Sequence, residues 1–324
     1  MKAVLCKTFG PPDALVVEDI PVPRPGKGEM RIRVGACALN FFDTLIIANR
    51  YQYKPDLPFS PGAELAGTVS EVGEGVEGYA VGDRVAAYAG WGAAREEVVV
   101  PAGRVVPLPD GLDFEAAAGL LVTYGTTYHA LKDRAAMQAG ETLAVLGASG
   151  GVGIAAVELG KVMGARVIAC ASSPEKLDFC RRHGADALID YSRESLKDRL
   201  KDLTDGRGVD VIYDPVGGDY CDPALRATAW KGRYLVIGFA AGDIPKVPLN
   251  LALLKGMCIC GVFWGHFVDV EAEAARANHA QILAWAAEGR IAAPVDRSFP
   301  LDRAVEALEV IARREARGKI VLVP

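Results

Sequence analysis

One segment constrains this chain more than any other: an apolar run that leads directly into a glycine-rich turn. Residues 142–147 (TLAVLG) have the short apolar pattern of a buried strand, and the turn GASGGVG at 147–153 follows without a spacer. A helical pattern, IAAVELGKVMG, begins at once, and a second apolar run, RVIAC, comes at 166–170. Strand, glycine turn, helix and second strand in this order predict a βαβ unit that binds the pyrophosphate of a dinucleotide.

The glycines of this turn have separate predicted tasks. Gly147 permits the tight turn, and Gly153 lets the helix pack closely. Gly150 and Gly151 let backbone N–H groups approach a phosphate, and the helix N-terminus adds partial positive charge. A purely structural glycine turn is the alternative. We expect the whole turn to contact the cofactor: Gly147, Ala148, Ser149, Gly150, Gly151, Val152 and Gly153.

The residues after the second strand indicate which dinucleotide binds. NAD-specific sites place a carboxylate about 20 residues past the glycines, but Ala171 occupies that position here. A carboxylate about 4 Å from a 2′-phosphate would cost about 4 kcal/mol at an effective dielectric constant of 20, so its absence permits NADP. Ser172, Ser173 and Lys176 offer hydroxyls and a cation to that phosphate. The serines could also cap the next helix, with the lysine facing solvent. We expect NADPH as the cofactor.

The character of the sequence changes near residue 122. Before it, short β-like runs such as 29–39 (EMRIRVGACAL) and 64–73 (ELAGTVSEVG) alternate with turn signals, which predicts a β-rich domain. After it, apolar runs alternate with helical patterns, which is typical of a parallel sheet. The expected strands are 142–147, 166–170, 187–190, 209–214, 233–239 and 319–323, and the expected helices are 152–163, 174–183, 194–203, 219–229, 269–289 and 301–314.

Composition and charge exclude several classes of partner. A chain of 324 residues is longer than one hydrophobic core supports, so two domains are expected. The net charge of −5 and the scattered Lys and Arg residues argue against nucleic acid as a partner. No apolar stretch reaches the length of a membrane span or signal-peptide core, so we expect no membrane association and a cytoplasmic protein. The 7 cysteines form no CxxC pair and predict reduced, mostly buried thiols. Cys258 and Cys260 would share one face of a buried strand, more consistent with packing than with metal binding.

Several segments together resemble one known family. Residues 40–51 (NFFDTLIIANRY), 61–85 (PGAELAGTVSEVGEGVEGYAVGDRV) and 214–218 (DPVGG), with the turn GASGGVG, are similar to the medium-chain dehydrogenase/reductase superfamily. Within it, the chain resembles the quinone oxidoreductase group that includes zeta-crystallin. The resemblance covers essentially the whole chain.

This resemblance implies an α/β protein of two domains. A GroES-like β-rich catalytic domain would comprise residues 1–121 and 265–324. A Rossmann domain with a doubly wound parallel sheet would comprise residues 122–264. Members of the group commonly form homodimers through the edge of the Rossmann sheet, so a homodimer is expected.

The resemblance also indicates where a catalytic zinc ion would bind. Zinc-dependent relatives carry a cysteine and a histidine where this sequence has Asn40 and Ala63, neither of which can ligate zinc. Asp43 and Glu64 alone cannot supply three protein ligands. The cysteines of a structural zinc site would fall near residues 90–105, where none occurs. We therefore predict no metal. Hydride transfer from NADPH to an electron-poor acceptor does not require a Lewis acid, so a quinone or α,β-unsaturated carbonyl (enone) is the expected small-molecule substrate.

Individual site residues follow from the same resemblance. Asn40, Tyr51 and Thr127 match positions beside the nicotinamide and substrate and are the predicted catalytic residues, Tyr51 as a hydrogen-bond or proton donor. Leu45 replaces a second tyrosine found in some relatives, which makes the substrate pocket more apolar. Further predicted cofactor contacts are Tyr191, on the 2′-phosphate side with Lys176, and Gly238, Phe239, Phe263 and Trp264 near the nicotinamide.

Some alternatives remain open. The same scaffold could reduce 2-alkenals or enoyl thioesters, or bind NADPH without turnover. Tyr51 could be a surface aromatic residue beside Tyr53, and Asp43 could brace its helix instead of taking part in catalysis. The sequence does not define the role of His266.

Overall fold

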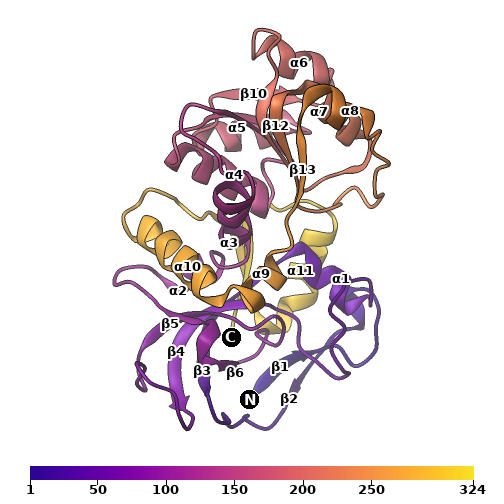
Figure 1. Ribbon diagram of the computed structural model, residues 1–324. Helices are drawn as coiled ribbons and strands as arrows, with labels where there is room; N and C mark the ends of the chain where they lie inside the picture. The colour runs from indigo at the N-terminus through magenta and orange to yellow at the C-terminus, as the bar shows by residue number, and fades with distance from the viewer. The chain divides into compact units, whose positions relative to one another are not determined.

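The computed structural model describes residues 1–324, which form two compact units (Figure 1). Unit 1 comprises Met1–Val122 and Phe267–Pro324, and unit 2 comprises Thr123–His266. Unit 1 is built around a mixed β-sheet and unit 2 around a parallel sheet with helices, so the predicted fold class is confirmed. None of the helices has the length and apolar character needed to cross a membrane.

Unit 2 contains a 6-stranded parallel sheet in the order β10-β9-β8-β11-β12-β13. Its strands are β8 (Thr142–Leu146), β9 (Arg166–Ala171), β10 (Ala187–Asp190), β11 (Val209–Asp214), β12 (Thr228–Val236) and β13 (Cys258–Gly261). Val145 of β8 pairs with Ala169 of β9 on one side and Tyr213 of β11 on the other. Because the strand order reverses between β8 and β11, a ligand site is expected at the carboxyl ends of these two strands.

Helices connect the strands of unit 2 and cover the sheet (Figure 1). They are α3 (Thr123–Tyr128), the π-helical η3 (His129–Arg134), α4 (Gly151–Val162), α5 (Pro174–Arg182), α6 (Leu196–Asp202), η4 (Gly218–Tyr220), α7 (Cys221–Ala227), α8 (Asn250–Lys255) and α9 (Trp264–Val270), which ends in unit 1. Strands β8 to β11 agree with the predicted strands to within one residue. The predicted strand 233–239 overlaps β12 at residues 233–236, but its bounds were wrong, because β12 begins at Thr228 and ends at Val236.

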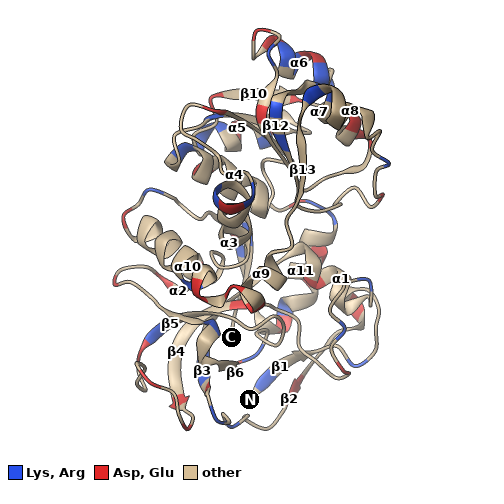
Figure 2. Cartoon of the chain, in the orientation of Figure 1, with Lys and Arg blue, Asp and Glu red and all other residues tan.

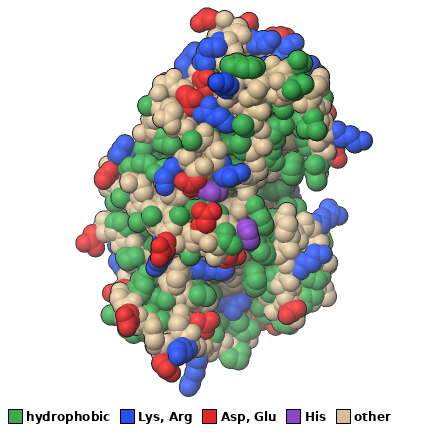
Figure 3. Space-filling model, viewed as in Figure 1, with side chains coloured by type: hydrophobic (Ala, Val, Ile, Leu, Met, Phe, Trp, Pro, Cys, Tyr) green, Lys and Arg blue, Asp and Glu red, His purple; other side chains and the backbone are tan.

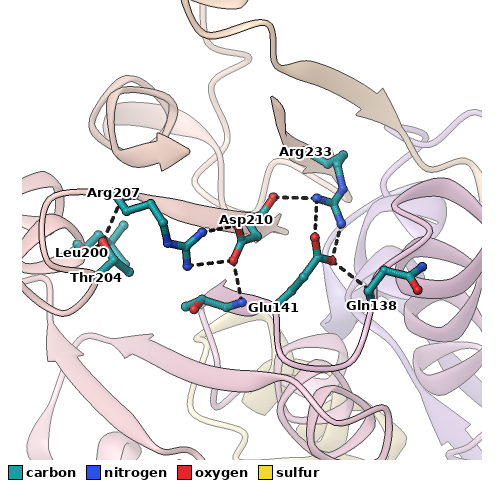
Figure 4. A network of polar contacts seen from close by, with 9 residues as sticks. Gln138, Glu141, Leu200, Thr204, Arg207, Asp210 and Arg233 are labelled. Atoms are coloured by element: carbon teal, nitrogen blue, oxygen red, sulfur yellow. Dashed lines mark hydrogen bonds and ion pairs between the residues drawn. The ribbon is translucent and has the colours of Figure 1, made fainter. Parts of the chain in front are cut away.

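An ion-pair network joins the amino ends of β8 and β11 to Arg233, in the middle of β12 (Figure 4). Glu141, just before β8, pairs with Arg233 of β12 at 2.5 Å, and Arg207 pairs with Asp210 of β11 at 2.5 Å. Asp210 also accepts the backbone N–H of Thr142. The network lies at the opposite ends of these strands from the glycine turn, so we assign it a structural role.

Unit 1 contains a 7-stranded sheet in the order β14-β15-β3-β4-β5-β7, with β6 paired to β3. Its strands are β3 (Glu29–Leu39), β4 (Glu64–Val72), β5 (Arg84–Tyr88), β6 (Glu97–Pro101), β7 (Val105–Pro107), β14 (Val295–Pro300) and β15 (Lys319–Val323); β1 (Lys2–Leu5) and β2 (Val16–Asp19) form a separate pair. Its helices are η1 (Pro12–Ala14), α1 (Phe41–Ile47), η2 (Ala102–Arg104), α2 (Phe114–Ala118), α10 (Ala272–Ala287), η5 (Leu301–Arg303) and α11 (Ala304–Ala312). The predicted strand 319–323 is confirmed as β15, which pairs with both β14 and β3 inside the sheet.

Three further predictions need correction. The helix expected at 269–289 is divided, because Glu271 between α9 and α10 has a non-helical backbone (φ −125°, ψ 47°). The helix expected at 301–314 begins as η5 and ends at Ala312. Cys258 is exposed and Cys260 half-buried, because β13 is an edge strand with β12 as its single neighbour.

Charged side chains of both signs are interspersed over both units (Figure 2). Most of the ion pairs join residues close in sequence on exposed helices and turns, such as Arg303 with Glu306 and Arg313 with Glu309. Exposed pairs of this kind contribute little to stability. One pair, Lys319 with Glu64, is almost completely buried and is described below.

Candidate functional site

The glycine turn follows β8 at the point where the strand order reverses. Gly147 has φ +58°, and an added Cβ there would lie 2.9 Å from Cγ2 of Val216. An added Cβ on Gly153 would lie 2.2 Å from the carbonyl oxygen of Gly147 and 2.8 Å from Cα of Ala148. Neither backbone atom can move without opening the turn. Gly150 is less restricted, because its added Cβ would be 3.5 Å from the same carbonyl oxygen.

The turn presents backbone N–H groups at the start of α4. Gly150 precedes the helix, and the first N–H bonded within the helix is that of Ile154, which donates to the Gly150 carbonyl at 2.8 Å. The N–H groups of Gly151, Val152 and Gly153 therefore have no acceptor within the helix. These donors and the helix dipole suit a pyrophosphate, and all seven predicted residues lie together.

A second loop packs against the glycine turn at the end of β11. The buried Asp214 accepts the N–H groups of Val216 at 2.7 Å and Gly217 at 2.9 Å, and its other oxygen accepts the hydroxyl of Tyr234. Burial raises the pKa of the Asp214 carboxyl, while these hydrogen bonds lower it. Asp214 therefore fixes the loop whose Val216 side chain contacts Gly147.

The segment after β12 lies beside the same loop. Ala240 N–H donates to the Pro215 carbonyl at 3.0 Å, which places Gly238 and the 39% exposed Phe239 beside the β11 loop. Phe263, after β13, is also exposed, whereas Trp264 is buried with its indole against Gly125 of α3. Trp264 thus contributes to packing within unit 2. Its predicted cofactor contact, like those of the other three residues, stays a prediction.

The predicted 2′-phosphate residues lie together at the ends of β9 and β10. Ala171 is buried as the last residue of β9, and its carbonyl accepts the N–H of Tyr191 at 3.2 Å. The ammonium group of Lys176 lies 3.5 Å from the Ser172 hydroxyl. Ser173 caps α5 by accepting the N–H of Lys176 at 3.4 Å, so the capping role is confirmed for this serine. No acidic side chain occupies the position of Ala171.

Thr127 lies on α3 with its hydroxyl fully buried inside unit 2. The hydroxyl donates to the Thr123 carbonyl at 2.8 Å and lies 2.8 Å from the Tyr213 hydroxyl. It also lies 3.3 Å from the carbonyl of Val152 in the glycine turn. These contacts indicate that Thr127 braces the turn; its predicted catalytic role stays a prediction.

Unit 1 contains a buried polar cluster of Asn40, Asp43, Glu64 and Lys319. The Lys319 ammonium donates to the Asn40 side-chain oxygen at 2.7 Å and to Glu64 Oε1 at 2.8 Å. The Asn40 side-chain nitrogen donates to the same Glu64 oxygen at 3.0 Å, and Glu64 Oε2 accepts the N–H of Val122 at 2.7 Å. The charged groups of Lys319 and Glu64 are thereby hydrogen-bonded, as burial requires.

Asp43 fixes the backbone around Asn40. One of its oxygens accepts the N–H of Asn40 at 2.7 Å and the other accepts the N–H of Gly62 at 2.9 Å. The alternative in which Asp43 braces its helix therefore agrees with the structure. Burial raises the pKa of Asp43 to about 6, although both N–H groups and Lys319 lower it.

The raised pKa of Asp43 predicts a pH-dependent stability. Because the folded state binds this proton more tightly than the unfolded state, stability is greatest below the usual pKa of 3.8 and is lost as the pH rises through about 6. Between pH 4 and 7, the wild-type free energy of unfolding should fall by roughly 2 kcal/mol relative to that of Asp43→Asn. Urea denaturation of both proteins across this range measures the difference, and a constant difference would contradict the assignment.

Tyr51 belongs to a row of aromatic rings in unit 1. Its ring stacks on Phe42 with centroids 5.1 Å apart and lies 5.9 Å from Tyr53, which is 6.5 Å from Trp91. Burial, followed by the neighbouring Tyr53 and Asp43, raises the pKa of Tyr51 to about 12. The phenol therefore keeps its proton at neutral pH and can donate a hydrogen bond. It is half-buried in this row rather than fully exposed.

Lys319 was not predicted to be part of any site. A signal was present: a lysine begins the otherwise apolar run KIVLV of a predicted strand. A charged residue in a buried strand requires an oppositely charged partner. The sequence alone does not show that this partner is Glu64.

Unit 1 is β-rich and is built from the first and last segments of the chain, whereas unit 2 is a Rossmann unit with a glycine turn. This combination defines the architecture of the medium-chain dehydrogenases/reductases. Comparison with family models agrees: residues 26–110 match the alcohol dehydrogenase GroES-like domain, and residues 151–279 match the zinc-binding dehydrogenase model.

Known proteins are similar over the full length of the chain. It is 40% identical to quinone oxidoreductase-like protein 2 homolog of Nematostella vectensis, covering 99% of this chain and 88% of that protein. It is 35% identical to a quinone oxidoreductase of Pseudomonas aeruginosa, covering 100% and 99%. The Escherichia coli quinone oxidoreductase complexed with NADPH superimposes with a TM-score of 0.93 at 28% identity, covering 100% of both chains. The chain therefore belongs to the quinone oxidoreductase family of medium-chain dehydrogenases/reductases.

The residues of the buried cluster do not fit a catalytic zinc ion. Asn40 and Ala63 replace the expected cysteine and histidine, and the Lys319 ammonium already lies within 2.8 Å of both Asn40 and Glu64. No group of three or more His, Cys, Asp or Glu side chains could hold a metal ion. A dinucleotide does fit the turn of unit 2, because the N–H groups of Gly151, Val152 and Gly153 have no acceptor within α4 and can bind a pyrophosphate.

Proposed function

We propose that this protein is an NADPH-dependent, zinc-independent reductase of quinones or α,β-unsaturated carbonyls. The observation that supports the cofactor most directly is the pairing of a sterically required glycine turn with Ala171, Ser172 and Lys176 at the end of β9. Relatives and solved neighbours named quinone oxidoreductases, one of them complexed with NADPH, support the same proposal.

Bound NADPH would supply a hydride to the acceptor. The residues of unit 2 would hold the dinucleotide: Gly151, Val152 and Gly153 through their N–H groups at the pyrophosphate, and Lys176 at the 2′-phosphate. Phe239 and Phe263 would exclude water near the nicotinamide.

Unit 1 would supply hydrogen-bond donors to the acceptor. As the acceptor is reduced, negative charge develops on its oxygen, and a fixed N–H or O–H donor stabilises that charge. We assign this role to the amide of Asn40, with Tyr51 as a second donor. Since its pKa is about 12, Tyr51 would hold its proton until the oxygen beside it becomes strongly basic.

The aromatic row favours a flat acceptor. Trp91, at one end of the row, is 41% exposed and so presents an aromatic side chain to solvent beside Tyr53. Offset stacking on such rings suits a quinone better than a flexible acyl chain. The exposed ring of Trp91 therefore supports quinones over enoyl thioesters as the proposed acceptors.

A panel of acceptors tests the proposed function. We expect NADPH oxidation with 1,2-naphthoquinone to exceed that with crotonyl-CoA or a 2-alkenal. A strong preference for the thioester would replace the quinone assignment with an enoyl reductase. Binding of NADPH without its oxidation by any acceptor would indicate a binding protein. One equivalent of zinc per chain, in protein purified without chelators, would contradict the zinc-independent mechanism.

Lys176→Ala should separate the two dinucleotides. Loss of the cation removes one charge-assisted contact to the 2′-phosphate, which NADH lacks, so the dissociation constant for NADPH should rise about tenfold or more while that for NADH changes little. Fluorescence titration with both nucleotides measures this, with Lys132→Ala, an exposed lysine elsewhere in unit 2, as the control. Equal losses for NADPH and NADH would refute the phosphate assignment.

We further propose a homodimer formed through the edge of the unit 2 sheet. β13 has a neighbour on one side only, and edge strands of this kind pair readily with another copy. Hydrophobic side chains are visible over the flank formed by α8 and β13 (Figure 3). Exposed hydrophobic residues of α8 and its start are Leu249, Leu253 and Leu254, and the exposed Trp230 lies against Gly256 at the end of α8.

Leu253→Asp should convert the dimer to a monomer. Leu253 is 80% exposed, so the change should cost little in the monomer but should place an unpaired charge in the interface. Light scattering after size-exclusion chromatography measures the mass. Val81→Asp, at a 67% exposed valine of unit 1, is the matched control and should remain dimeric. A monomeric wild-type protein would contradict the proposal.

A further inference from the structure

Lys319 is the most completely buried lysine of an ion pair in the structure, and its donors are fully used. Its side chain is 3% exposed and that of Glu64 is 0% exposed. The ammonium donates to the Leu39 carbonyl at 3.1 Å, to the Asn40 side-chain oxygen at 2.7 Å and to Glu64 Oε1 at 2.8 Å. A lysine ammonium has three N–H groups, so none is left for a ligand.

This arrangement determines which way the Asn40 amide faces. An ammonium can only donate and a carboxylate can only accept hydrogen bonds. The Asn40 oxygen must therefore face Lys319, and its nitrogen must face Glu64, as the distances of 2.7 and 3.0 Å show. Turning the amide over would place its N–H groups against the ammonium and its oxygen against the carboxylate.

The same geometry leaves one amide proton of Asn40 without a protein acceptor. The side-chain nitrogen carries two N–H groups, and the hydrogen bond to Glu64 uses one of them. Asn40 is 7% exposed, the greatest value among the four cluster residues. Asp43 holds its backbone through a separate hydrogen bond of 2.7 Å. Backbone and side chain of Asn40 are thus fixed independently, by different residues.

We propose that Glu64 and Lys319 are positioning residues, which hold the Asn40 amide so that its second N–H donates to the acceptor oxygen during reduction. This inference rests on the proposed reductase function. Lys319 and Glu64 do not touch the acceptor themselves; they act through Asn40. A buried ion pair is weak evidence for a stabilising role, because apolar residues of the same volume often stabilise a fold equally well. Fixing one orientation of an amide, by contrast, requires a donor on one side and an acceptor on the other.

A double-mutant cycle tests whether the pair acts through Asn40. The variant Lys319→Met/Glu64→Gln removes both charges at nearly constant volume, which avoids an uncompensated buried charge and favours folding. We expect Asn40→Ala to lower kcat on the order of 100-fold. We expect the charge-free pair to lower kcat about tenfold in the wild-type background and to cause no further loss in the Asn40→Ala background. The NADPH affinity of all three variants, measured by fluorescence titration without an acceptor, should stay within about twofold of the wild-type value.

Each other outcome has a defined meaning. Equal losses of kcat in both backgrounds, or an unchanged kcat in the charge-free pair, would overturn the positioning role. If Asn40→Ala leaves kcat unchanged while the wild type turns over, the positioning role fails but the reductase proposal stands. If the wild type oxidises no NADPH, the proposed function itself fails. The control Arg233→Met/Glu141→Gln removes the ion pair of the unit 2 sheet (Figure 4) and should leave kcat unchanged.

Discussion

Gly153→Ala should abolish detectable NADPH binding, raising the dissociation constant by at least about 100-fold. The reason is steric: the new methyl group would lie 2.2 Å from the carbonyl oxygen of Gly147 and 2.8 Å from Cα of Ala148. Both are backbone atoms of the turn, so relief requires the start of α4 to move away from β8. That movement displaces the N–H groups that would bind the pyrophosphate. Fluorescence titration with NADPH measures the loss.

The control for this change is the same substitution at a glycine with open space. An added Cβ on Gly103 of unit 1 meets no atom within 4 Å, so Gly103→Ala should bind NADPH normally. Circular dichroism separates a local loss of binding from unfolding of Gly153→Ala. Normal affinity in Gly153→Ala would show that the turn tolerates a side chain and that the cofactor binds elsewhere.

Lys319→Met should cause a large loss of stability in unit 1. It leaves the Glu64 carboxylate buried without its cation, and breaking one side of a buried pair typically costs about 3–5 kcal/mol. For a unit of this size, the corresponding fall in the melting temperature is about 10 °C. Urea denaturation and calorimetry at pH 7 measure both quantities.

The double variant is the informative comparison for this prediction. Lys319→Met/Glu64→Gln removes the orphaned charge, so it should recover more than half of the lost stability. If the double variant is less stable than Lys319→Met, the hydrogen bonds of the pair stabilise the fold by more than the burial of its two charges costs. That result would favour a structural role over orientation of Asn40.

The glycine turn could be predicted from the sequence because the residues that determine it are close together in the chain. Strand, turn and helix are contiguous, and the steric need for Gly147 and Gly153 arises from atoms within a few residues or in the adjacent β11 loop. Strands β8 to β11 were predicted for the same reason: each is a short apolar run between polar turns. The parallel sheet then follows from the order of the elements.

The buried cluster of unit 1 could not be predicted in this way. Glu64 and Lys319 are far apart in sequence and meet because β15 pairs with β3, which in turn pairs with β4. The apolar pattern of 319–323 indicates a strand but not its neighbour in the sheet. Asn40 and Asp43 were identified through the resemblance to a family, and their partners required the structure.

The exposure of side chains on the edge strand β13 could not be predicted from the sequence either. The run at 258–261 has the composition of a buried strand, but its position in the sheet decides its burial. β13 is the last strand of the order, so Cys258 is exposed. If a second copy covers this edge, as proposed, the composition of the strand reflects the dimer and not the isolated chain.

The position of β15 has a consequence for the order in which the molecule forms during synthesis. Unit 2 is one continuous stretch, Thr123–His266, whereas the sheet of unit 1 needs β14 and β15 beside β3. While the ribosome is still translating, the first 122 residues have an unfilled edge along β3, and the carboxylate of Glu64 has no cation. The central unit is therefore the first that can complete its sheet, although it is encoded second. Lys319 is synthesised only after the whole of unit 2, so a chain that stalls before this residue would display a folded Rossmann unit and an unfinished unit 1 that chaperones and proteases can recognise.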